Sequence, residues 1–242
     1  ERNLPGDLGL ALALRSRVLV RDDLRVLVMS ATIDAAPVAA LLGGAPVIES
    51  HGRLFPVETR YRPAREGQWI DASAAAAVRA ALAGDAGDAG DVLVFLPGQG
   101  EIARTAMALS DVDASVDVMP LYGAMPLDAQ DRAIRPSPAG RRKVVLATAI
   151  AETSLTIEGV HVVIDSGLSR VPRFDARSGM ARLATTRVSR ASADQRRGRA
   201  GRLGPGVCYR LWAEGDDAQL LAQRTPEMLE ADLAPLALEL AA

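Results

Sequence analysis

The feature that most constrains the fold of this chain is a regular alternation of short apolar runs with helical stretches. The apolar runs have the length of a buried strand and lie at residues 24–29, 91–96, 115–119, 143–146 and 160–164. Runs of this kind are typical of strands that are covered on both faces. Helical patterns occupy residues 71–82, 101–109 and 126–134. Strand–helix–strand units with right-handed crossovers therefore predict an α/β fold with a three-layer parallel β-sheet.

Segments outside this alternation predict a hairpin and two flanking regions. Residues 168–188 alternate in short pieces around a turn and predict a β-hairpin that projects from the sheet. Residues 9–20 predict a helix that leads into the first apolar run, and residues 225–242 predict an amphipathic helix rich in Leu and Ala. We expect three parts: the end of a preceding domain (1–50), the main domain (51–212) and the start of a following domain (213–242).

Composition excludes several classes of protein. Cys208 is the one cysteine, which leaves no disulfide framework. One cysteine and two histidines in the whole chain are too few for a zinc cluster. We therefore predict no metal site. The chain has no apolar run of about 18 residues and does not start like a signal peptide, so we predict no membrane contact and a cytoplasmic location.

Charge is distributed unevenly along the chain. Residues 132–202 carry fifteen basic and five acidic side chains, whereas the rest carries thirteen basic and twenty-five acidic ones. The overall net charge of −2 therefore conceals a strongly basic segment. Such asymmetry predicts a face that binds a polyanion, either phosphates or nucleic acid.

The most specific local pattern is QRRGRAGR at residues 195–202. It predicts a helix that begins near Ser192 and ends in a turn, where Gly198 and Gly201 allow a close backbone approach. Arg199 and Arg202 are three residues apart and share a face if the turn persists. Two guanidiniums on one face suit a phosphate chain. The alternative interpretation is an ordinary charged helix end.

A second pattern follows the apolar run at 143–146. Hydroxyl side chains gather in a loop after this strand, at Thr148, Thr153, Ser154 and Thr156. Ligands of such sheets bind at the carboxyl ends of strands, and hydroxyls can donate to phosphate oxygens. Taken singly, each residue is equally consistent with ordinary capping.

A third pattern suggests a different ligand. Gly98 and Gly100 lie in PGQGEIA between a predicted strand and a predicted helix, and Asp117 follows at the distance of a ribose-binding acid. This arrangement is close to a dinucleotide-binding fingerprint. A dinucleotide site would leave residues 195–202 without a role.

Five motifs in order resemble those of DEAH-box helicases of superfamily 2. They are Ser30-Ala31-Thr32, residues 93–98, residues 120–123, residues 148–159 and residues 195–202. The resemblance covers almost the whole chain and implies a RecA-like fold, the C-terminal motor domain of a P-loop NTPase-type helicase. It implies an ATP-dependent RNA helicase whose ATP and Mg²⁺ are bound mainly by a first RecA-like domain. The partners implied are RNA or other single-stranded nucleic acid, that first domain and a winged-helix domain.

The resemblance also implies a role for individual residues. Arg199 and Arg202 match arginine fingers, and Gln195 matches a glutamine beside the attacking water. The matches at the nucleotide are Ser154, Thr156, Glu158 and Ile134. Ser30, Ala31 and Thr32 match a motif that couples the two domains. The matches at the RNA are Thr148, Gly98, Gly123, Arg170 and Arg173.

Two departures and two alternatives accompany this interpretation. Relatives often have asparagine where this chain has Ala149, and many stack the adenine on a phenylalanine where it has Ile134, which predicts weaker base stacking. The sequence shows no Walker A loop, so we expect the chain alone neither to hydrolyse ATP nor to bind it tightly. The alternatives are a non-catalytic RNA- or protein-binding module and a Rossmann-type oxidoreductase that uses Gly98 and Gly100.

Overall fold

A computed structural model describes residues 2–30, 34–49, 55–86, 90–138, 140–152, 155–175 and 177–241. The chain divides into two compact units. The sheet unit comprises Arg53–Val171 and Thr185–Gln223, and the second unit comprises Glu1–Gly52, Pro172–Ala184 and Arg224–Ala242. The predicted three-part division differs from these units in its boundaries and stays a prediction.

The sheet unit is built on six parallel strands in the order β1-β8-β5-β2-β4-β3. The strands are β1 (Val57–Tyr61), β2 (Asp91–Phe95), β3 (Val116–Leu121), β4 (Arg142–Ala147), β5 (Val160–Asp165) and β8 (Gly206–Arg210). Every pairing is parallel. The predicted parallel α/β sheet is therefore confirmed, together with four of the five predicted strands.

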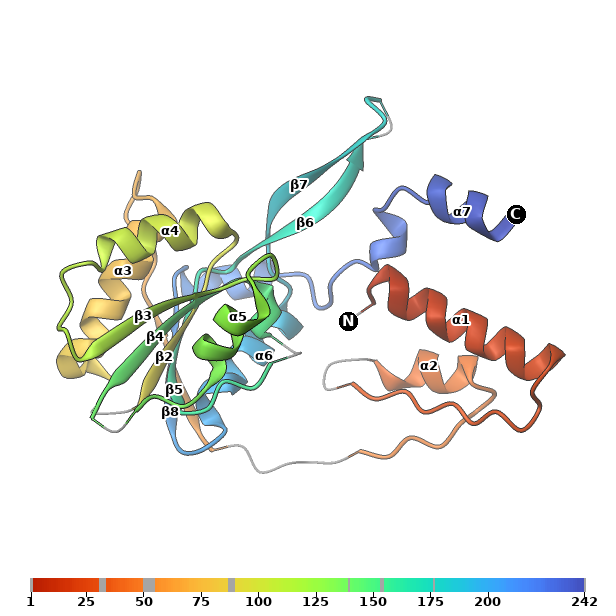
Figure 1. Ribbon diagram of the computed structural model, residues 1–242, viewed down its shortest axis with the longest axis horizontal. Coiled ribbons are helices and arrows are strands. Elements are labelled where there is room, and N and C mark those ends of the chain that lie inside the picture. The colour runs from red at the N-terminus through yellow and green to blue at the C-terminus, as the bar shows by residue number, and fades with distance from the viewer. Residues whose placement is uncertain are drawn as a thin grey trace. The chain divides into compact units, whose positions relative to one another are not determined.

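Helices cover both faces of this sheet and complete three layers (Figure 1). They are α3 (Ile70–Ala80), α4 (Gln99–Ala108), α5 (Leu127–Ile134) and α6 (Arg190–Gly198). Val92 and Val94 of β2 pack with buried residues of α3 and α4, whereas Leu93 and Phe95 pack with Ala133 of α5. Alternate side chains of one strand thus enter two separate cores, which explains why each strand reads as an uninterrupted apolar run.

The carboxyl ends of the strands are in register across the sheet. The aligned residues, in sheet order, are Tyr61, Arg210, Asp165, Phe95, Ala147 and Leu121. Three of these six positions, Tyr61, Arg210 and Asp165, carry polar side chains. This row forms the edge against which the loops after the strands are packed.

The predicted hairpin is present as β6 (Leu168–Asp175) and β7 (Met180–Arg187), which pair only with each other among the described residues. Gly167 precedes β6 with a φ of +71°, and a Cβ there would lie 2.7 Å from the Trp212 ring. Glycine is required at this turn both by its backbone conformation and by the close packing.

The second unit corrects two predictions. Helices α1 (Leu4–Leu19) and α2 (Ala35–Leu41) are present, and α1 confirms the helix predicted at 9–20. Residues 24–29, predicted as a strand, form no strand and pair with no described strand, so they gain no ladder hydrogen bonds. The helix predicted at 225–242 is instead a short turn, η5 (Glu227–Leu229), followed by α7 (Ala234–Ala241). Asp232 accepts a hydrogen bond from the Ala234 amide and so starts α7 late. None of the helices in the described ranges is long and apolar enough to cross a membrane.

Candidate functional site

Two segments meet beyond the carboxyl end of β4. The β4 loop comprises residues 148–156, of which 153 and 154 lie outside the described residues, and it starts with the turn η2 (Ala149–Ala151). The arginine segment comprises residues 195–202, which are the end of α6 and the following turn η3 (Arg199–Gly201). The turn η3 follows α6 directly, so the arginines lie alongside the β4 loop.

The start of α6 differs from the sequence prediction. Ser189, not Ser192, is the N-cap: its Oγ accepts a hydrogen bond from the Ser192 amide at 3.2 Å. The N-cap therefore lies three residues before the predicted one, and the helix begins at Arg190. Further along, a Cβ on Gly201 would lie 2.6 Å from the carbonyl oxygen of Phe55, so the glycine allows the arginine segment to approach the residues before β1.

Arg199 and Arg202 both contact the β4 loop. The Nη1 atom of Arg202 donates to the hydroxyl of Thr156 at 3.1 Å, and the Arg202 side chain is exposed. Arg199 is only 4% exposed and donates to two loop carbonyls, those of Leu155 (2.5 Å) and Glu152. The sequence prediction that both arginines face the same partner is consistent with this geometry.

The charge of Arg199 is incompletely compensated. Its Nε atom is buried and finds no acceptor among the described residues. Burial, with the nearby charge of Arg202, lowers the pKa of Arg199 to about 10, while Glu152 acts in the opposite direction. The guanidinium still carries its charge at neutral pH, and an anion nearby would stabilise it.

Sequence analysis missed the role of Arg196, which is 1% exposed. Its Nε donates to Glu152 Oε1 at 2.6 Å, and its Nη1 donates to Asp165 Oδ1 at 2.7 Å and to the Leu168 carbonyl at 3.2 Å. Its Cζ lies 4.8 Å from the centre of the Phe95 ring. Burial disfavours the charged guanidinium, but Asp165 and Glu152 outweigh this effect and raise the pKa of Arg196.

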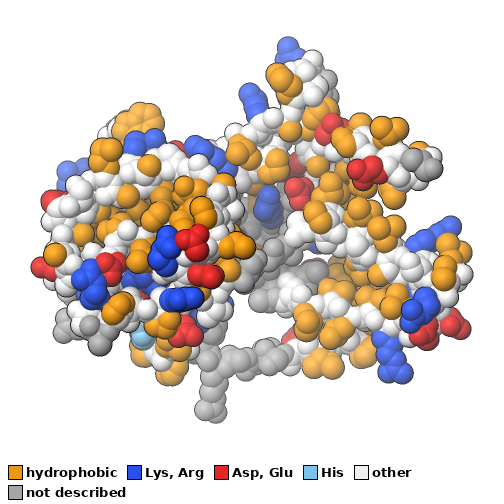
Figure 2. All heavy atoms as spheres, viewed as in Figure 1, with side chains coloured by type: hydrophobic (Ala, Val, Ile, Leu, Met, Phe, Trp, Pro, Cys, Tyr) orange, Lys and Arg blue, Asp and Glu red, His pale blue; other side chains and the backbone are white. Residues whose placement is uncertain are grey.

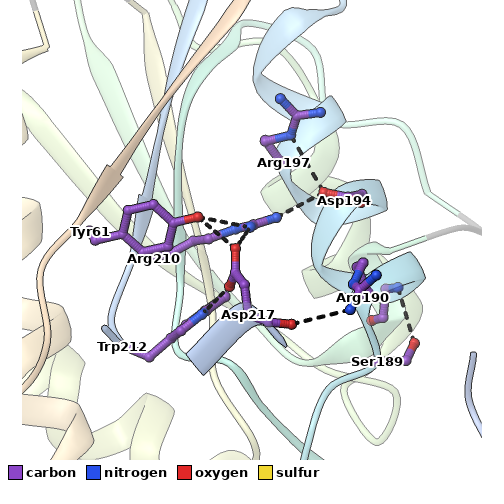
Figure 3. A network of polar contacts seen from close by, with 9 residues as sticks. Tyr61, Ser189, Arg190, Asp194, Arg197, Arg210, Trp212 and Asp217 are labelled. Atoms are coloured by element: carbon purple, nitrogen blue, oxygen red, sulfur yellow. Dashed lines mark hydrogen bonds and ion pairs between the residues drawn. The ribbon is translucent and has the colours of Figure 1, made fainter. Parts of the chain in front are cut away.

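The other side of α6 is held by a polar network (Figure 3). Arg210 donates to Asp194 of α6 at 2.8 Å and to Asp217 at 2.6 Å. Asp217 also accepts from Trp212 Nε1 at 2.6 Å and from the Tyr61 hydroxyl at 2.6 Å. This network anchors the helix to the carboxyl ends of β1 and β8, which fixes the arginine segment relative to the sheet.

Residues predicted to bind RNA lie near the carboxyl ends of several strands. Gly98 is buried beneath the guanidinium of Arg170, whose Cζ would lie 2.8 Å from a Cβ at that position. Arg170 in turn pairs with Glu101 at 3.3 Å. Thr148 is half-buried and Gly123 is exposed. Arg173 belongs to the second unit, where it pairs with Glu230 at 3.5 Å.

The remaining predicted site residues lie in several parts of the chain. Ile134 is half-buried and packs against the core beneath α5. Glu158 is exposed and lies close enough to Lys143, at the amino end of β4, for its charge to act on that lysine. Gln195 is half-buried on α6, and Ser30 is exposed in the second unit. Ala31, Thr32 and Ser154 lie outside the described residues.

The basic segment predicted from the sequence is partly neutralised in the folded chain. Arg132, Arg141 and Arg187 pair with aspartates that lie outside residues 132–202. Figure 2 accordingly shows basic and acidic side chains interspersed on the visible face of the sheet unit. The described residues of that face therefore form no continuous basic patch in this view. The evidence for an anion site comes from the arginines at the β4 loop.

A family model for the helicase conserved C-terminal domain matches residues 74–204 of the chain. The chain belongs to this helicase C-terminal domain family. The match spans both the β4 loop and the arginine segment. It excludes the oxidoreductase alternative, in agreement with the Arg170 guanidinium that covers Gly98.

Several RNA helicases are similar to this helicase domain in sequence. ATP-dependent RNA helicase HrpB of Escherichia coli (strain K12) is 49% identical over 241 residues, which are 99% of this chain and 29% of that protein. Pre-mRNA-splicing factor ATP-dependent RNA helicase prp22 of Schizosaccharomyces pombe is 39% identical over 221 residues, 88% of this chain and 19% of that protein. The probable ATP-dependent RNA helicase DHX34 of Mus musculus is 38% identical over 251 residues, 99% of this chain and 22% of that protein.

Two crystal structures of E. coli HrpB have the same fold as this helicase domain. One, described as a DEAH/RHA helicase, has a TM-score of 0.92, and the other, described as a DExH-box NTPase, has a TM-score of 0.89. Both are 49% identical to the chain and cover 99% of it. The sheet is therefore the RecA-like sheet of a helicase C-terminal domain. The chain spans less than a third of the length of these curated relatives.

Proposed function

We propose that this chain is the second motor domain of an ATP-dependent RNA helicase of the DEAH-box type. The observation that carries the proposal is the meeting of Arg199 and Arg202 with the β4 loop at the carboxyl ends of the strands. The named relatives are RNA helicases over the same region, which supports the same activity for the whole protein.

Arg202 is the residue best placed to reach a phosphate from this edge. Its partner, the Thr156 hydroxyl, is neutral, so the guanidinium keeps a full charge to offer to an anion. Phosphoryl transfer depends on positive charge placed where negative charge develops, and an arginine finger contributes about 10³–10⁵ in rate. We assign this role to Arg202.

Arg199 also has a structural role. It donates to two carbonyls of the β4 loop and keeps that loop in place beneath Arg202. Its buried Nε has no acceptor among the described residues, which fits an anion that is to be bound nearby. Gln195 and Ser154 complete the site in this proposal, as the residues beside the attacking water and the nucleotide.

The described residues fit the phosphates of ATP better than they fit a magnesium ion. When bound, ATP supplies the γ-phosphoryl group that is transferred to water. The arginines fit its phosphate chain, and Ile134 offers only an aliphatic surface to the base. In the described ranges, no group of three His, Cys, Asp or Glu side chains could hold a metal ion. We propose, from the resemblance to DEAH-box helicases, that Mg²⁺ and most nucleotide contacts belong to a first RecA-like domain.

RNA would be held mainly through its backbone. We propose that Thr148, Gly123 and Arg170, with Gly98 beneath Arg170, lie at the strand ends that face RNA, and that Arg173 of the hairpin also contacts it. Such contacts are largely independent of sequence and weaken as salt rises. Closure of two motor domains would bring Arg202 to the nucleotide and couple hydrolysis to movement. Motif III (Ser30, Ala31, Thr32) and a cytoplasmic location belong to the same proposal.

The test is the ATPase activity of the full-length protein with and without a single-stranded uridine oligonucleotide. We expect RNA to stimulate hydrolysis in the full-length protein, and we expect no hydrolysis by residues 1–242 alone. An ATPase rate from residues 1–242 equal to that of the full-length protein would contradict the proposed division of labour. RNA binding by a full-length protein without ATPase activity would instead favour a non-catalytic binding module.

A further inference from the structure

We propose that Arg196 is a positioning residue that couples the β4 loop to the base of the β6–β7 hairpin. The hairpin base is defined as residues 165–168, which connect β5 to β6. This inference rests on the proposed function, because it concerns how RNA at the hairpin affects hydrolysis at the β4 loop. Arg196 itself is buried and reaches neither ligand.

Arg196 bonds to both segments at once. One side of its guanidinium contacts the Glu152 carboxylate in the β4 loop, at 2.6 Å from Nε. The Nη1 atom contacts the hairpin base through Asp165 Oδ1 (2.7 Å) and the Leu168 carbonyl (3.2 Å). Within the described part of the chain, the guanidiniums of Arg199 and Arg202 donate hydrogen bonds to the β4 loop alone. Arg196 is therefore the arginine that joins the loop to the hairpin.

The hairpin base fixes the point where β6 begins and the point where β7 ends. Asp165 Oδ1 accepts a hydrogen bond from the Gly167 amide at 2.9 Å, in addition to the bond from Arg196. The Gly167 carbonyl accepts from the Val188 amide at 2.9 Å, directly after β7 ends. A displacement of Asp165 would therefore reach β6 through the turn and β7 through Val188.

The link is stiff enough to transmit a displacement. Arg196 is 1% exposed and Asp165 is fully buried, and the guanidinium is stacked on Phe95 of the central strand β2. Charge-assisted hydrogen bonds between groups removed from water are short and directional. A shift of Glu152 in the β4 loop therefore moves Arg196 and the hairpin base together.

A purely stabilising role would have a different signature. Buried ion pairs often contribute little net stability compared with apolar residues, so a melting temperature alone does not identify a coupling residue. A residue that only stabilises the fold lowers RNA-stimulated and unstimulated ATPase rates by the same factor. A coupling residue lowers the RNA-stimulated rate more. The ratio of the two rates is therefore the informative measurement.

The experiment compares Arg196→Lys with Arg197→Lys in the full-length protein. Lysine keeps the charge but cannot contact Glu152 and the hairpin base together. Arg197 is the matched control, because it is the next residue on α6, is 40% exposed at its side chain and pairs with Asp194 at a long 3.7 Å. For Arg196→Lys we expect the stimulation by a uridine oligonucleotide to fall about tenfold. For Arg197→Lys we expect no change in that stimulation.

A second variant, Glu152→Gln, removes one charge from the same link and decides the matter if Arg196→Lys does not fold. We expect it to lower the stimulation by about threefold. Equal factors for the stimulated and unstimulated rates in both folded variants would overturn the inference and leave the proposed function intact. A wild-type protein whose ATPase does not respond to RNA would overturn both.

Discussion

At the amino ends of β2 and β4, Lys143 and Asp91 form a closed buried pair, whereas charged groups at the carboxyl edge of the sheet are left partly unpaired among the described residues. Lys143, the one lysine of the chain, is 2% exposed, and its Nζ donates to the Arg135 carbonyl at 2.5 Å and lies 3.9 Å from Asp91 Oδ2. Asp91 accepts from the Lys143 amide at 2.8 Å and from the Ser137 hydroxyl at 3.0 Å.

The opposite edge keeps unsatisfied atoms. Arg199 Nε and Asp165 Oδ2 are buried and find no partner among the described residues. Buried polar groups without partners are costly, and they are found where function requires them. The comparison indicates that one edge of the sheet serves stability and that the other is prepared for a ligand.

The largest expected effect on stability comes from the amino edge. Lys143→Met leaves the Asp91 carboxylate buried without its cation, so we expect a loss of about 3 kcal/mol in the free energy of unfolding. Urea unfolding measures this loss. Adding Asp91→Asn removes the remaining charge and should recover part of the stability. A loss below about 1 kcal/mol for Lys143→Met would show that the pair is not the stabilising contact described.

A smaller effect on stability is expected from Arg199→Ala. The substitution removes hydrogen bonds from a charged donor to the carbonyls of Glu152 and Leu155, which are worth about 1.5–3 kcal/mol together after relaxation. ATP turnover should fall as well, because the β4 loop loses its support. Arg202→Ala is the matched control, since this exposed side chain should leave the melting temperature unchanged. Equal melting temperatures for Arg199→Ala and the wild type would contradict the supporting role of Arg199.

Much of this fold could be predicted because its central strands are buried on both faces. The runs at 91–96, 143–146 and 160–164 were identifiable from side-chain type alone. The strands β1 and β8 escaped prediction because neither has a long apolar run: charged residues alternate with others in β1, and β8 is short and ends in Arg210. Glu58 pairs with Arg60 within β1, and Arg210 of β8 reaches Asp217.

The candidate site was predictable only where its residues are close together in the sequence. The glycine and arginine spacing at 195–202 identified Arg199 and Arg202, which contact the β4 loop as neighbours on one turn. Arg196 reads as one more basic residue in the sequence, because its partners Glu152 and Asp165 are 44 and 31 residues away. Contacts across such distances depend on strand order, which the local pattern does not contain.

We propose that the carboxyl edge of the sheet carries the chemistry and that the amino edge carries stability. RNA-stimulated ATP turnover of full-length Arg202→Ala and Lys143→Met, measured at one temperature at which both variants are folded, tests it most directly. We expect Arg202→Ala to lose about 10³-fold in turnover while it still binds RNA, and Lys143→Met to stay within about twofold of the wild type. Turnover near the wild-type value for Arg202→Ala, or an equally large loss for Lys143→Met, would contradict the account.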